Sequence, residues 1–65
     1  MRKVMLLYGE TPWKSEWQKK SFKDDTAAME FIRRHRKNIH GINYVKRNVS
    51  SLSHFEIAEL IRGDI

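Results

Sequence analysis

Residues 24–38 read DDTAAMEFIRRHRKN and carry the strongest helical pattern in this chain of 65 residues. At about 100° per residue, one side of such a helix collects mainly apolar side chains: Ala28, Phe31, Ile32, His35 and Ile39. We therefore expect an amphipathic helix whose apolar side forms one wall of a core.

Charged and capping residues mark the ends of this expected helix. Asp24 or Asp25 can accept hydrogen bonds from the unpaired backbone N–H groups of the first turn. Gly41 follows as a natural stop, although Asn38 could itself take the left-handed cap. The side opposite the core carries the densest positive charge in the chain: Arg33, Arg34, Arg36 and Lys37. The negative end of the helix dipole favours these cations.

Composition limits the fold to one small core. A chain of this length buries only about 60% of its unfolded surface, so modest stability is expected. The absence of cysteine excludes disulfides and thiolate metal sites. No apolar run approaches the ~20 residues of a membrane span, and the N-terminus lacks a signal-peptide pattern. We expect one compact domain over residues 1–65, a cytoplasmic location and no membrane contact.

The charge balance is strongly basic. The chain has 13 Lys and Arg against 8 Asp and Glu, which gives a net charge of +5 and a pI near 9.9. Such a balance suits a polyanionic partner such as a nucleic acid. Ordinary solubility charge explains it equally well, so composition alone leaves both readings open.

Two strands are expected ahead of the helix. Residues 2–8 contain an unbroken apolar run, which favours a central strand covered on both faces. Residues 9–15 form a turn cluster with the only proline. Residues 15–22 follow as a more polar strand, and Lys19 and Lys20 suit an edge position because they discourage pairing with another chain.

A third strand is expected after the helix. Residues 42–49 alternate well enough for a strand, with Ile42, Tyr44 and Lys46 on one face. A right-handed crossover through the helix would bring this strand beside the first one. The expected sheet is three-stranded and antiparallel, in the order 2-1-3.

A short second helix is expected within residues 51–65. Ser53 and Glu56 have the spacing of a capping box, and Gly63 stands where a C-terminal glycine belongs. The chain therefore reads as an α+β domain in the order β-β-α-β-α, with the first helix packed on one face of the sheet.

Catalysis and metal binding have little support in the sequence. The spacing of His35, His40 and His54 matches no metal signature, so no metal or cofactor is expected. The basic cluster with His35 and His40 could in principle bind phosphate and shuttle protons, as a small ribonuclease does. Because so short a chain has little room for a preorganised site beside a core, we expect a binding protein and not an enzyme.

The sheet offers a second basic surface. On the face opposite the first helix, the period of two collects two aromatic and two basic residues: Trp17, Lys19, Tyr44 and Lys46. Such a face could stack bases and meet phosphates. The alternative is that Trp17 and Tyr44 complete a small core, covered by the last helix.

Two kinds of binding protein fit these features. The first binds nucleic acid or nucleoprotein and makes its phosphate contacts with Arg33, Arg34, Arg36, Lys37, Lys19, Lys20 and Lys46. The second is a small adaptor or inhibitor, of the type that phages and mobile elements encode. It docks on a protein partner through Trp13, Trp17 and Tyr44. Lysines on an edge strand favour a monomer in either case.

Overall fold

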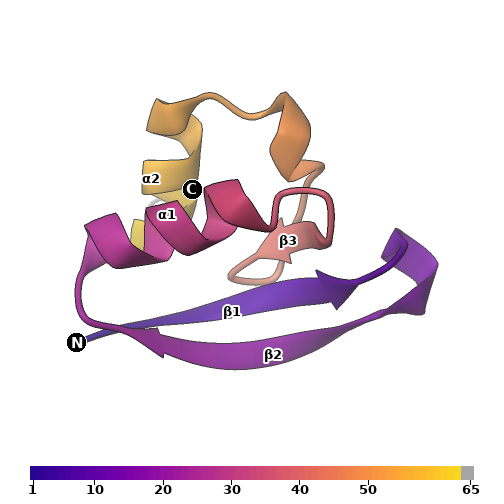
Figure 1. Ribbon diagram of the computed structural model, residues 1–65, viewed down its shortest axis with the longest axis horizontal. Helices are drawn as coiled ribbons and strands as arrows, with labels where there is room; N and C mark the ends of the chain where they lie inside the picture. The colour runs from indigo at the N-terminus through magenta and orange to yellow at the C-terminus, as the bar shows by residue number, and fades with distance from the viewer. Residues whose placement is uncertain (64–65) are drawn as a thin grey trace.

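The computed structural model describes residues 1–63 and consists of one sheet with two α-helices on one of its faces (Figure 1). The elements follow in this order: β1 Arg2–Gly9, the 3-10 helix η1 Pro12–Lys14, β2 Ser15–Phe22, α1 Asp25–Arg34, β3 Ile39–Ile42, β4 Val45–Lys46, the 3-10 helix η2 Val49–Ser51 and α2 His54–Arg62. The predicted α+β class is confirmed, with four strands in place of three.

The sheet has the order β2-β1-β3-β4 and is antiparallel throughout. β1 pairs with β2 along its whole length, from Arg2 opposite Phe22 to Gly9 opposite Ser15. On its other edge β1 pairs with β3, which places Leu6 opposite Ile42. The predicted central position of the first strand is therefore confirmed.

The core lies between the sheet and both helices (Figure 1). Each element contributes the apolar side chains that its period directs inward. The buried cluster consists of Val4, Leu6, Ala28, Ile32, Ile39, Ile42, Val49, Ile57, Leu60 and Ile61. The carboxylate of Asp24 caps α1 by accepting from the N–H of Ala27 at 2.9 Å, as expected for one of the two candidate caps.

α1 ends four residues earlier than predicted. The N–H of His35 donates to the carbonyl of Phe31 at 3.1 Å, and the chain then leaves the helix. Neither Asn38 nor Gly41 has a positive φ, so neither forms the left-handed cap. The reason is tertiary: Ile39 is fully buried in β3 beside β1, and a longer helix would carry it away from the core.

Residues 42–49, predicted as one strand, instead contain the last residue of β3, a turn, β4 and the start of η2. Asn43 and Tyr44 form the two-residue turn of the β3–β4 hairpin with φ values of 48° and 69°, the pattern of a type I′ turn. Ile42 and Val45 pair across the hairpin, and both pack against the core. The prediction that Ile42 shares a face with Lys46 is wrong, because the turn reverses the chain between them.

The side chain of Asn43 explains why the chain turns here. Its Oδ1 accepts from the N–H of Met5 at 3.1 Å, and the backbone N–H of Asn43 donates to the Met5 carbonyl. Its Nδ2 donates to the carbonyls of Leu60 and Ile61 at 2.6 and 3.1 Å. One asparagine thus joins β1 to the last turn of α2.

Gly41 lies within β3 and does not end a helix. A Cβ atom there would stand 2.8 Å from Cη2 of Trp17 and 2.9 Å from the carbonyl oxygen of Val45. Contacts that short are not tolerated, so glycine is needed because the Trp17 ring lies across this position.

α2 matches its prediction closely. The N–H of Glu56 donates to Ser53 Oγ at 3.2 Å, and the N–H of Ser53 donates back to Glu56 Oε1 at 3.3 Å. This capping box opens the helix, and Gly63 closes it with a left-handed φ of 74°. Within residues 1–63, no helix has the length and apolar character needed to cross a bilayer.

Candidate functional site

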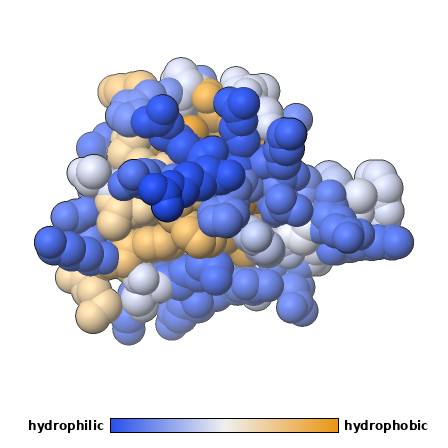
Figure 2. Space-filling model, viewed as in Figure 1, coloured by the Kyte–Doolittle hydropathy of each residue, from blue (hydrophilic) through white to orange (hydrophobic). Residues whose placement is uncertain are grey.

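Acidic residues are absent from the chain between Glu30 and Glu56. That stretch runs from the last turns of α1 through the β3–β4 hairpin to the start of α2. Its basic residues are Arg33, Arg34, Arg36, Lys37, Lys46 and Arg47, all of them exposed. Hydrophilic residues accordingly cover the outward side of α1 and its surroundings, while hydrophobic residues show between α1 and the sheet (Figure 2). This stretch of the chain therefore carries an excess of positive charge.

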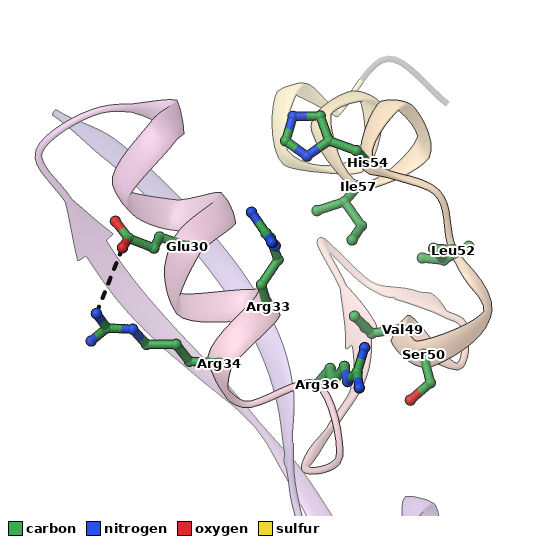
Figure 3. Close-up of a pocket in the computed structure, with 9 residues that line it drawn as sticks. All are labelled: Glu30, Arg33, Arg34, Arg36, Val49, Ser50, Leu52, His54 and Ile57. Carbon is green, nitrogen blue, oxygen red and sulfur yellow. Dashed lines mark ion pairs between the residues drawn. The ribbon is translucent and has the colours of Figure 1, made fainter.

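An open groove of about 600 Å³ separates α1 from the segment that leads into α2 (Figure 3). We call it the arginine groove. Its lining residues are Glu30, Arg33, Arg34, Arg36, Val49, Ser50, Leu52, His54 and Ile57. Val49 and Ile57 are buried, so the base of the groove is apolar and its rim is basic.

The three arginines of this groove are placed differently (Figure 3). Arg33 projects into the space between α1 and α2, and Arg36 reaches toward Ser50. Arg34 turns back to Glu30, with 3.6 Å between Nη2 and Oε1, in an exposed pair of the kind that contributes little. Within residues 1–63, Arg33 and Arg36 make no ion pair, and both guanidinium groups remain available to an anion.

A second open groove of about 510 Å³ adjoins the first. We call it the lysine groove, and its lining residues are Pro12, Lys37, His40, Lys46, Arg47, Asn48 and Ser50. Ser50 lines both grooves, so the two lie side by side, and we call the pair the basic track. Arg36 and Lys37, predicted on the helix, lie instead in the turn after it, where they connect the two grooves.

Arg47 belongs to the basic track but was not among the predicted site residues. Its Nη2 lies 3.8 Å from Glu56 Oε2, which offsets part of its charge. The signal that could have identified Arg47 is the stretch without acidic residues, because every Lys and Arg in that stretch lines one of the two grooves.

The face of the sheet away from the helices has no other element of residues 1–63 packed over it (Figure 1). We call it the open sheet face. The pairing register assigns Trp17 and Lys19 to it, and Lys46 joins them because it pairs with Gly41. The Tyr44 ring lies 5.1 Å from that of Trp17, at an interplanar angle of 47°. The alternative that α2 covers these aromatics is wrong, since α2 packs on the opposite face.

Lys20 is separated from Lys19 by the sheet. It pairs with Val4 and so faces the helices, where its Nζ lies 5.4 Å from the Phe31 ring and 6.0 Å from the Tyr8 ring. Both distances fit cation–π contacts at the edge of the core. The structure therefore gives Lys20 a packing role and does not bring it to either basic surface.

Trp13 lies at the tip of the β1–β2 hairpin, in η1, and is 80% exposed. Thr11 caps this short helix by accepting from the N–H of Lys14 at 3.2 Å. Its neighbour Pro12 lines the lysine groove, so Trp13 directly follows a residue of the basic track in the chain.

The three histidines occupy different places. His35 packs against the Phe31 ring at 4.4 Å, and His40 Nε2 lies 3.1 Å from the carbonyl of Gly9. His54 lines the arginine groove. Within the described residues 1–63, no group of three or more His, Cys, Asp or Glu is placed to hold a metal ion.

Comparisons with known proteins return no match: no family model, no curated protein and no solved structure matches the chain. The chemistry of the basic track and of the open sheet face is therefore the ground on which a function can be proposed.

Proposed function

We propose that the protein binds nucleic acid and that the basic track contacts the phosphate backbone. The observation that carries this proposal is that two basic grooves lie side by side and share Ser50, and that Arg33 and Arg36 make no ion pair within residues 1–63. Cations that neutralise phosphates release condensed counterions, and this release supplies most of the affinity of sequence-independent binding.

The size of the molecule limits the length of nucleic acid that it can contact. Its longest dimension is 28 Å. At about 3.4 Å per nucleotide along one strand, this length spans roughly eight nucleotides. Contacts to phosphates carry no sequence information, so we expect binding to unrelated sequences with similar affinity.

The first test reverses charge in the track. Arg33→Glu combined with Lys37→Glu should lower affinity for unrelated oligonucleotides by about tenfold or more, because two phosphate contacts become repulsive. Both side chains are exposed, so circular dichroism and the unfolding midpoint should stay close to those of the parent protein.

A matched pair of variants distinguishes the effect of a charge within the basic track from the effect of net charge. Lys37→Glu and Lys23→Glu change net charge equally, but only Lys37 lines the track. Fluorescence anisotropy should show a clear loss of affinity for Lys37→Glu and less than about a twofold change for Lys23→Glu. Equal losses from both variants, or no binding by the parent protein at low salt, would contradict the proposal.

Docking on a protein is a second candidate function. Trp13 and Phe55, which are 80% and 66% exposed, favour it because large exposed aromatics often anchor interfaces. In that case Trp13→Ala should weaken capture of one acidic partner more than Lys37→Glu does. A pull-down from nuclease-treated lysate checks this, since a nucleic-acid-bridged partner would be lost after the nuclease.

A further inference from the structure

Tyr44 combines an unfavourable backbone conformation with an exposed ring. Its φ of 69° is left-handed, a region that bulky residues rarely enter. Its turn neighbour Asn43 has a structural reason for this conformation, because its side chain joins β1 to α2. The Tyr44 side chain has no such role: the residue is 68% exposed, and its ring contacts Trp17. The type I′ turn requires a positive φ at both of its central residues, so it holds Tyr44 in this conformation with its ring exposed.

Trp17 holds the Tyr44 ring in place from one side. The Trp17 ring lies across Gly41, so closely that even a methyl group there would stand 2.8 Å from Cη2. Leu7, opposite Trp17 in the sheet, is buried beneath it. The centroid of the Tyr44 ring lies 5.1 Å from that of Trp17, and most of the Tyr44 side chain remains exposed to solvent. The pair is a rigid aromatic surface on an otherwise uncovered sheet.

Positive charge surrounds this aromatic pair. By the pairing register, Lys3 and Lys19 lie on the open sheet face, as does Lys46. Among the described strands the one acidic residue is Glu16, and it pairs with Tyr8 on the helix side. The open sheet face is therefore complementary to a polyanion that also presents flat apolar surfaces.

Lys46 connects the open sheet face with the basic track. It lies opposite Gly41 in the β3–β4 pairing, next to the Trp17 ring, and it also lines the lysine groove. A chain of phosphates that follows the track thus reaches the aromatic pair without leaving basic surface.

We propose that the ligand is a single-stranded nucleic acid, with at least one base stacked on Tyr44 beside Trp17. The inference rests on the proposed function and makes it more specific. Base faces in a duplex are covered by neighbouring base pairs, whereas a single strand can turn a base toward an aromatic ring. Every base has such a face, so the site selects strandedness and not sequence.

The test compares a single-stranded oligothymidylate of about 12 nucleotides with a duplex of equal length. Tyr44→Asn is the informative variant, because asparagine tolerates left-handed φ and removes the ring. Single-strand affinity should fall by about 5- to 150-fold, the range for losing one stacked base, while duplex affinity changes by less than about twofold. Tyr44→Phe keeps the ring and should retain parent affinity.

Two controls keep the result specific. Phe55→Asn removes another exposed aromatic, on α2, that lines neither groove and is not part of the sheet, and it should leave single-strand affinity unchanged. In a Trp13→Phe background the remaining indole is Trp17, so its fluorescence should change when oligothymidylate binds. No fluorescence change, or equal affinity of Tyr44→Asn and parent for the single strand, would overturn the inference.

Failure of the inference and failure of the proposed function give different results. If single strand and duplex bind equally well and respond only to Lys37→Glu, nucleic-acid binding stands and the stacking site does not. If the parent protein binds neither form at low salt, both proposals fall.

Discussion

The two faces of the sheet differ in what covers them. On one face Val4, Leu6 and Ile42 are almost completely buried beneath α1 and α2. On the other face Trp17 and Tyr44 lie over the sheet with no described element above them. The helices cover the sheet on one side only, so no described element covers the second side.

Neighbouring residues of β1 give the sharpest test of this contrast. Leu6 faces the helices and Met5 faces away, so Leu6→Ala should cost about 2–5 kcal/mol of unfolding free energy. Met5→Ala should cost about 1 kcal/mol, because its side chain is only partly buried. Urea unfolding followed by circular dichroism measures both. Equal losses would show that the two faces contribute alike to stability.

Asn43 joins β1 to α2, and its replacement should have the next largest effect. Asn43→Ala removes three side-chain hydrogen bonds and places alanine at a positive φ, at a cost of about 2–4 kcal/mol. Asn43→Gly removes the same hydrogen bonds but tolerates the positive φ. It should therefore cost less unfolding free energy than Asn43→Ala, but still a measurable amount. An Asn43→Gly variant as stable as the parent would mean that the bonds to β1 and α2 contribute nothing.

Gly41 tests how closely Trp17 packs on the open sheet face. Gly41→Ala should destabilise by about 1–3 kcal/mol, because its Cβ would overlap the indole. In a Trp17→Ala background the same change should cost at least about 0.5 kcal/mol less, since the ring is gone. Chemical unfolding of the four proteins of this cycle gives the coupling. If Gly41→Ala costs the same unfolding free energy in both backgrounds, its Cβ does not clash with the Trp17 ring.

The smallest expected effect lies at the start of α2. Ser53→Ala removes one half of the capping box and should cost about 0.5–2 kcal/mol. Glu56→Gln can keep the reciprocal bond and serves as the matched control. An unchanged urea midpoint for Ser53→Ala would show that packing of Ile57, Leu60 and Ile61 alone holds the helix.

The parts of the fold that the sequence predicts are those with local signals. The start of α1 follows from the carboxylate of Asp24, and α2 follows from Ser53, Glu56 and Gly63. The central place of β1 follows from its unbroken apolar run. In each case neighbouring residues determine the conformation, so a short window of sequence is enough.

Residues 35–46 were predicted less well because distant residues decide their structure. The turn at Asn43 and Tyr44 lacks the glycine of the usual signal, and contacts of Asn43 with β1 and α2 stabilise it. The glycine at position 41 looked like a helix stop, yet it is required by Trp17, which lies 24 residues earlier. No local pattern carries that information.

The sequence predicts which cations cluster in the candidate site, but not how the fold arranges them. Its cations were recognised as a cluster, yet Lys20 packs over Phe31 on the helix side, and Arg34 pairs with Glu30. Successive residues of a strand point to opposite faces, so Lys19 and Lys20 cannot share one, and the strand register decides which of the two faces the helices. The sharing of Ser50 by two grooves depends on how η2 packs, which the sequence does not reveal.

The central claim is that one side of this protein contacts a phosphate backbone, and salt dependence tests it most directly. With four contacts, from Arg33, Arg36, Lys37 and Lys46, the logarithm of affinity for a single strand should fall with log salt at a slope of about −3. Between about 50 and 200 mM salt, affinity would then drop by roughly 50-fold. An affinity that stays constant over that range, or no binding at its lower end, would contradict the account.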